Sequence, residues 1–226
     1  AALSAAGLTV VDLTDDTLTL SLAGRTAALS LGNLRRTLAC LDPALHAAAI
    51  QRFTRLAVVG LGSRERGVLL PRITAPGDAK STTTPWFSPM LDGRLWLTLV
   101  EDRGEVMRYV RPMDFVRWRL SLAVARQQAM DNLRLHSAGV APERVGEGIW
   151  RLATGDGLDA SRLLILEQWF DETVYALPLS RDELWLTTDA RKSVGMVEAL
   201  GGRVGRVAYG IVGWLVVWRE GRLEVG

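Results

Sequence analysis

SLAVARQQAMDNLRLH, from Ser121 to His136, is the stretch around which the chain is organised. Its apolar residues recur at the three- and four-residue spacing of one helical face, as Leu122, Ala125, Ala129 and Leu133. Ser121 is positioned to cap the first turn, and Gly139 to end the helix. Because a helix with one apolar stripe must bury that stripe, we expect a sheet formed by the flanking segments to pack against it.

Runs typical of β-strands lie on both sides of this helix. At the amino-terminal end, 8–13, 17–22 and 26–31 predict a β-meander, and two helices follow it, one of them opened by Asp42 and Pro43. Polar turns between apolar runs predict two hairpins, 95–101 with 105–110 and 174–179 with 184–188. Further strands are expected at 149–153, 204–209, 212–218 and 222–225, and helices at 162–170 and 189–200. The sequence therefore predicts an α+β fold of mostly antiparallel sheets with packed helices.

The periodic pattern dissolves in the segment that joins the meander to the first hairpin. GLGSRERG, Pro71, ITAPGDAKSTTTP and Pro89 have the composition of loops. A connection of this length is longer than those found within compact domains, so it is interpreted as a linker or a functional loop. We therefore predict two subdomains: 1–60 is a meander with two helices, 61–89 is a loop or linker, and 90–226 is a larger α+β domain.

Composition indicates a folded protein without metal or disulfide chemistry. The chain has 226 residues, 48% of them apolar, and a formal net charge of only +2, too small by itself to indicate nucleic acid or an anionic membrane as the partner. The single cysteine, Cys40, excludes an intrachain disulfide, and two histidines are too few for a Cys/His zinc cluster. No signal peptide is visible, and the most apolar run, 207–218, is shorter than the roughly 20 residues that span a bilayer. We expect a cytoplasmic protein with no membrane contact and no cofactor.

Motifs that carry chemistry are weak throughout. AVVGLGSRERG, 57–67, fails as a dinucleotide fingerprint because Glu65 stands where the third glycine belongs. Asp156 and Asp159 in GDGLDAS lack the spacing of a calcium loop, so no metal site is predicted. An enzyme whose residues converge only in the fold stays an alternative, with Asp159, Ser161, Arg162 and Arg181 as its candidates.

A basic cluster is the most informative signal. From Arg103 to Arg134 there are seven arginines and three acids, with aromatic residues between them. Such a mixture suits phosphate contacts and base stacking, and it also suits a solvated helix face with Trp118 in the core. The candidate binding residues here are Arg108, Arg111, Arg117, Trp118 and Arg126.

Four segments resemble, in order, the bacterial family typified by the YtpQ protein of bacilli. They are YVRPMDFVRW, DNLRL, GDGLDASRLLILEQ and VYALPLSRDELWLTTD, and the resemblance covers about residues 95–200. The matching positions are Trp118, Asn132-Leu133, Asp159-Ala160-Ser161 and Arg181-Asp182, whereas Arg119 stands where the family favours glycine. Since no activity is established for that family, the resemblance implies a bacterial cytoplasmic protein but no named active site.

These observations favour a non-enzymatic partner-binding or regulatory protein whose partner is another protein. The first alternative is a nucleic-acid-associated protein that uses the arginine-rich face. The second is an enzyme of unidentified class.

Overall fold

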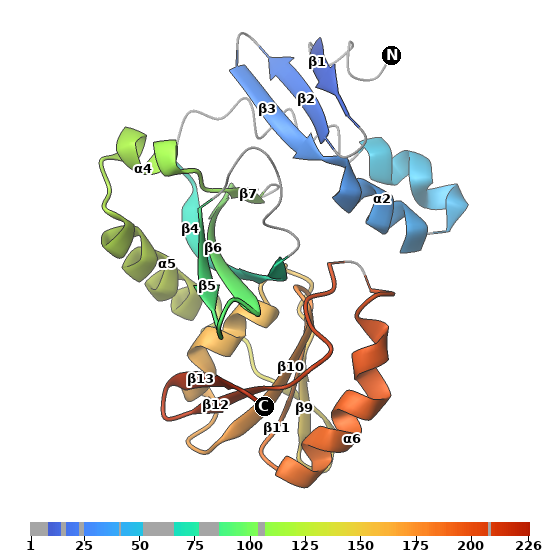
Figure 1. Cartoon of the computed structure of the whole chain (residues 1–226), viewed down its shortest axis with the longest axis vertical. Helices are drawn as coiled ribbons and strands as arrows, with labels where there is room; N and C mark the ends of the chain where they lie inside the picture. The colour runs from blue at the N-terminus through green and yellow to red at the C-terminus, as the bar shows by residue number, and fades with distance from the viewer. Residues whose placement is uncertain are drawn as a thin grey trace. The chain divides into compact units, whose positions relative to one another are not determined.

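The computed structural model describes residues 9–14, 17–22, 25–40, 42–51, 66–76, 86–103, 107–207 and 209–226. The fold is α+β, as predicted, with three mostly antiparallel sheets (Figure 1). The chain divides into two units. The described residues up to Val68 and in the segment 101–108 form the first unit, and those in 69–100 and from Tyr109 onward form the second.

The first unit contains the predicted β-meander. Its sheet has the order β1 (Thr9–Leu13), β2 (Thr17–Leu22), β3 (Arg25–Ser30), and helix α2 (Leu31–Cys40) follows. Asp42 then begins the short helix η1 (Pro43–Leu45) by accepting the N–H of Ala44 on Oδ1 at 2.8 Å. Most of the glycine-rich segment 57–67, including Glu65, lies outside the described residues.

A four-stranded sheet occupies the middle of the chain. It has the order β4 (Val68–Thr74), β6 (Leu95–Asp102), β5 (Phe87–Met90), and β7 (Met107–Tyr109) also pairs with β6. The prediction of a loop over 61–89 is wrong for β4, in which Leu69–Thr74 are buried, and for the start of β5. Pro71 can lie in β4 because β4 is an edge strand, where a missing N–H leaves no ladder bond unmade.

Helices α4 (Pro112–Trp118) and α5 (Leu122–His136) accompany this sheet. The predicted stripe of α5 is confirmed at Ala125, Ala129 and Leu133, which are buried, and the first two pack with Leu69, Leu99 and Val110. Leu122 is the exception, since the first turn leaves it exposed. Ser121 caps the helix by accepting the N–H of Val124 at 3.3 Å.

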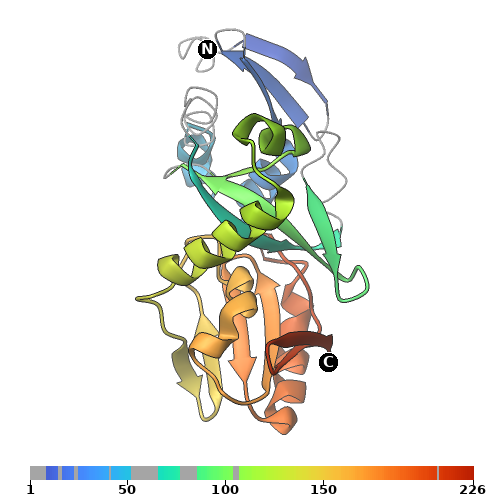
Figure 2. The same ribbon diagram turned by 90° about the vertical axis from the view of Figure 1, so that its left-hand side faces the viewer.

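A six-stranded sheet forms the largest part of the second unit. Its order is β13 (Arg222–Val225), β12 (Val216–Arg219), β10 (Val174–Ser180), β11 (Glu183–Thr187), β9 (Ile149–Leu152), β8 (Glu143–Gly146). The 3₁₀ helix η3 (Ala160–Gln168) and helix α6 (Ala190–Leu200) cover its opposite faces (Figures 1 and 2). Both outer strands are largely exposed and carry charged side chains, and β8 has a register shift between Arg144 and Gly146.

The predicted strand at 204–209 is wrong. The described residues there form turns after η4 (Gly201–Arg203), and Tyr209 adopts a left-handed backbone with φ of 58°. Gly210 explains the tight path, because a Cβ there would lie 2.0 Å from the carbonyl oxygen of Val204. An isolated bridge joins Gly210 to Ser180, and the N–H of Ile211 donates to the carbonyl of Leu179 at 2.9 Å.

Candidate functional site

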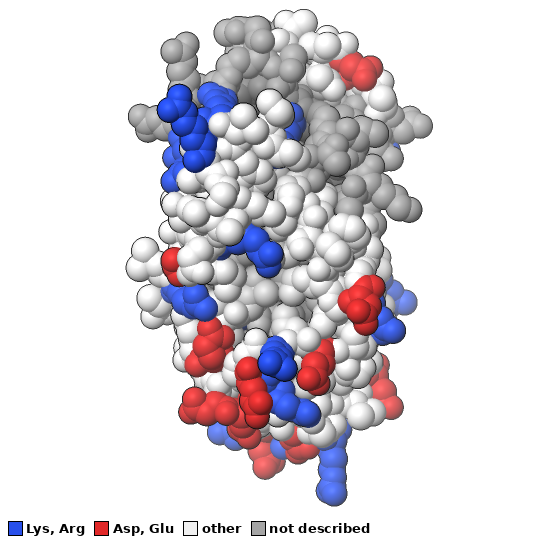
Figure 3. All heavy atoms as spheres, turned by 60° about the vertical axis from the view of Figure 1, so that its left-hand side comes forward, with Lys and Arg blue, Asp and Glu red and all other residues white. Residues whose placement is uncertain are grey.

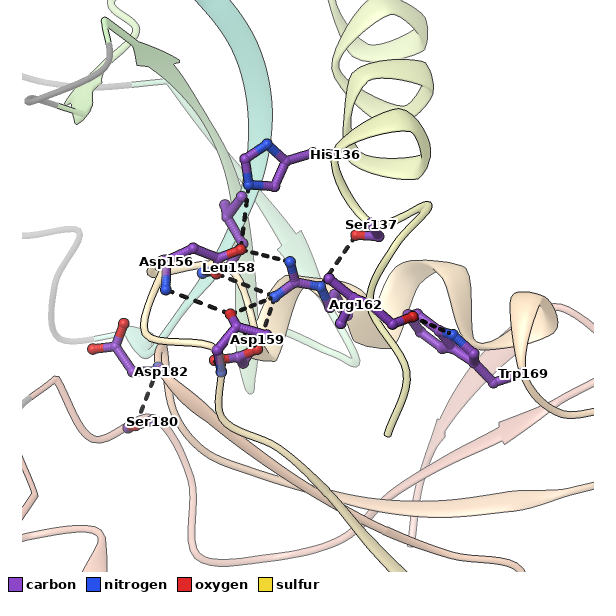
Figure 4. A network of polar contacts seen from close by, with 11 residues as sticks. His136, Ser137, Asp156, Leu158, Asp159, Arg162, Trp169, Ser180 and Asp182 are labelled. Atoms are coloured by element: carbon purple, nitrogen blue, oxygen red, sulfur yellow. Dashed lines mark hydrogen bonds and ion pairs between the residues drawn. The ribbon is translucent and has the colours of Figure 1, made fainter. Parts of the chain in front are cut away.

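The loop between β9 and η3, residues 153–159, builds a polar cluster (Figure 4). Gly155 and Gly157 have φ of 78° and 79°, a conformation that costs glycine little and lets the loop fold back on itself. Asp159 then accepts the backbone N–H of Thr154 on Oδ2 at 2.8 Å, and Asp156 accepts that of Leu158 on Oδ1 at 2.9 Å. The carboxylates of the loop therefore hold it closed through contacts within the loop itself.

Arg162 lies at the centre of the cluster, and its side chain is fully buried. Its Nη1 donates to Asp159 Oδ1 at 2.7 Å and to Asp156 Oδ1 and Thr154 Oγ1, both at 3.1 Å. Its Nη2 donates to Asp156 Oδ2, and its Nε donates to Ser137 Oγ at 3.1 Å. Every nitrogen of the guanidinium is engaged, so Arg162 cross-links the loop, η3 and the end of α5.

The charges of this cluster are unequal. Two carboxylates, Asp156 and Asp159, face one guanidinium, and His136 Nε2 lies 3.3 Å from Asp156 Oδ2 at the more exposed side. Burial works to raise the pKa of Asp156, but hydrogen bonds and attraction from Arg162 outweigh it and hold that pKa below its ordinary value. Burial raises the pKa of Asp159 above its ordinary value, and repulsion from Asp156 adds to the effect.

The side chains of the other two predicted enzyme candidates make different contacts. Ser161 is buried and its Oγ accepts the N–H of Ile73 at 3.2 Å, which ties η3 to β4. Arg181 lies in the β10–β11 turn, where its Nε donates to Asp182 at 3.0 Å and its guanidinium stacks on the Tyr209 ring, 3.4 Å from the centroid. The four candidates are thus neighbours in one region, but only Asp159 and Arg162 contact each other through their side chains.

Sequence reasoning missed Ser137 and Thr154 as partners of Arg162. Hydroxyl residues near a helix end and a glycine turn satisfy local backbone groups in most proteins, so nothing in the sequence marks them as partners of a distant arginine. Among the residues that the structure describes, no three His, Cys, Asp or Glu side chains are grouped to hold a metal ion. The cation between the two carboxylates is Arg162 itself.

Two of the predicted nucleic-acid candidates have other roles. Arg108 pairs with Glu101, a fully buried carboxylate that also binds Arg103 and the backbone N–H of Gly67. Trp118 is half-buried and packs against the core of Leu69, Leu99 and their neighbours, so it is a packing residue and not an open stacking platform.

The remaining arginines lie along α4 and α5. The backbone N–H of Arg111 donates to Asp114 Oδ2 at 2.9 Å, which begins α4. Arg126 is exposed, and its guanidinium lies over Trp86 at 5.9 Å from the ring centroid. Arg117 is exposed, and Arg119 ends α4 in a left-handed conformation with φ of 54°. Neither Arg117 nor Arg119 pairs with a carboxylate in the described part of the chain.

Helix α4 is apolar on two sides. Phe115 and Trp118 pack inward against the core, whereas Met113 and Val116 point away and remain 72% and 68% exposed. Met113, Val116 and Arg117 share one side because residues three and four apart are neighbours on a helix. We call these three residues and Arg119 the α4 outer face. In the space-filling view, acidic and basic side chains are mixed toward the lower end of the visible face, and basic side chains also lie in its middle and at its upper left (Figure 3).

No helix among the described residues combines the length and the apolar character needed to cross a membrane. Comparison of the chain with known protein families, with curated proteins and with solved structures found no match in any of the three.

Proposed function

We propose that this chain is a non-enzymatic protein of the bacterial cytoplasm that binds another protein in a partner-binding or regulatory role. The supporting observation is the α4 outer face. A helix of a folded protein normally buries its apolar side chains against the core, yet Met113 and Val116 keep most of their surface exposed. Exposed apolar side chains beside arginines that have no carboxylate partner in the described part of the chain have the composition of a protein contact surface.

The polar cluster supports a non-enzymatic role. Arg162 uses all three of its nitrogens on side chains of its own chain, and Asp159 is fully buried against it. The Oγ of Ser161 accepts a backbone N–H, and no base that could activate it contacts it among the described residues. These side chains fix the loop and η3 in place, which is a structural task.

The resemblance to the YtpQ-like family over about residues 95–200 is the basis for proposing bacterial origin and the cytoplasm. It stays a proposal, and it adds no activity to the chain.

Affinity capture from the native bacterium tests the proposed function. The full chain is immobilised as wild type, as Met113→Asp/Val116→Asp and as Val194→Asp, which places an aspartate at an exposed valine of α6. We expect one protein to be retained in stoichiometric amount by the wild type and the α6 control, and lost from the double variant. No stoichiometric partner, or equal capture by the double variant, would reject the proposal.

Nucleic acid is the second candidate partner, and the exposure of Arg117 and Arg126 favours it. A gel shift at low and high salt tests it, because phosphate contacts weaken as salt rises. Absence of binding at low salt would end this alternative.

A further inference from the structure

The α4 outer face has a definite width, length and charge. Met113, Val116 and Arg117 lie within about 100° of the helix circumference, and the seven residues of α4 span about 10 Å. The backbone N–H and C=O groups of α4 are directed along its own axis, so a partner can recognise this face only through side chains. A second helix laid across it presents an apolar stripe of the same width.

The charge of this face is positive and uncompensated. The one acid of α4, Asp114, is used at the start of the helix, where it accepts the backbone N–H of Arg111 at 2.9 Å. Arg117 and Arg119 follow the apolar pair directly and have no carboxylate partner among the described residues. A partner that buries Met113 and Val116 must therefore bring its own acids to the edge of the contact, or leave two cations beside an apolar interface.

From this combination we infer that the α4 outer face binds an acidic amphipathic helix of another protein. Apolar residues of that helix, spaced three and four apart, cover Met113 and Val116, and aspartate or glutamate residues beside them pair with Arg117 and Arg119. The inference rests on the proposed function and adds the chemistry of the partner segment to it.

An unbiased selection tests the partner chemistry. A displayed library of helical peptides, randomised at their surface positions, is first depleted of peptides that bind the Met113→Asp/Val116→Asp variant. The remaining peptides are then selected for binding to the full wild-type chain. We expect enrichment of peptides that carry leucine, isoleucine, valine or phenylalanine at i, i+3 or i+4, flanked by acids. No enrichment, or enrichment of neutral or basic peptides, overturns the inference.

Charge reversal separates this inference from the proposed function. For an enriched peptide, Arg117→Glu/Arg119→Glu should weaken binding by about tenfold or more, and higher ionic strength should weaken binding to the wild type. Arg191→Glu/Arg222→Glu reverses two exposed charges elsewhere and should leave binding unchanged. All these residues are exposed, and circular dichroism with thermal melting checks that each variant is folded.

The possible failures differ from one another. If a native partner is captured through Met113 and Val116 but is indifferent to salt and to Arg117→Glu/Arg119→Glu, the proposed function stands and the inference falls. If the wild type self-associates and Met113→Asp/Val116→Asp makes it monomeric, a second copy occupies the face and the inference is overturned. If acidic peptides bind as expected but no native partner is captured, the proposed function is rejected and the inference of a partner protein is overturned with it.

Discussion

Replacing Arg162 with methionine removes a buried charge while keeping an unbranched apolar side chain in its place. Asp159 is then a fully buried carboxylate without its counter-charge, and Asp156 loses two donors. Breaking a buried ion pair by removing one member costs about 3–5 kcal/mol. Since a whole domain is stable by about 5–15 kcal/mol, the variant should be close to its folding limit.

Urea unfolding followed by tryptophan fluorescence measures this loss. All eight tryptophans lie in the second unit, so the signal reports the unit that contains Arg162. With a urea dependence of about 2 kcal/mol per molar, the midpoint should fall by about 1.5–2.5 M. The cost should shrink on acidification, because a protonated Asp159 no longer needs a cation beside it.

The matched control is Arg134→Met, because the partners of Arg134 among the described residues are the exposed acids Asp131 and Glu167. Exposed pairs contribute about 0–1 kcal/mol, so this midpoint should hardly move. Adding Asp159→Asn to Arg162→Met should recover part of the loss, since the unpaired charge is then gone. An Arg162→Met variant within about 1 kcal/mol of wild type would refute the view that this arginine cross-links the unit.

Four smaller changes test the same unit. Gly157→Ala should cost about 1–2 kcal/mol in the urea assay, because φ of 79° is unfavourable for alanine, and a neutral result would contradict the loop geometry. Leu163→Ala, in the buried core, should cost about 2–5 kcal/mol by the same measurement. Arg119→Gly should be neutral or raise the melting temperature, whereas a clear loss would argue against the left-handed end of α4. The folded pKa of Asp156 is lowered, so its contribution is complete above the ordinary value of 3.8 and is lost as pH falls through the folded pKa. Asp156→Asn should therefore be less stable than wild type at neutral pH, with the gap closing in acid, and a gap independent of pH would count against the ion pair.

The elements that could be predicted are those with local signals. The stripe of α5 depends on residues three and four apart, and the β10–β11 hairpin depends on a polar turn between two apolar runs. Strand β4 was hidden because its apolar run contains Pro71, and proline argues against a strand unless the strand is known to lie at an edge. Whether a strand lies at an edge depends on the whole sheet and cannot be predicted from the seven residues of the strand itself.

The cluster around Arg162 shows the same limit for the site. Asp159 and Arg162 are three residues apart and could be nominated together, whereas Ser137 precedes Arg162 by 25 residues. Their meeting depends on how α5 ends and on how the 153–159 loop turns. The outward side of α4 is an intermediate case. PMDFVRW has more apolar residues than one side of a helix can hold. Only the fold shows that Phe115 and Trp118 are the two that pack against the core.

The outer strands of the six-stranded sheet limit how this protein can associate with copies of itself. Unpaired backbone N–H and C=O groups at the edge of a sheet can pair with a strand of another copy, and repeated pairing of this kind produces filaments. Here β8 has a register shift and carries Glu143 and Arg144, and β13 carries Arg222 and Glu224. We therefore do not expect a strand from another copy to add at either border of this sheet.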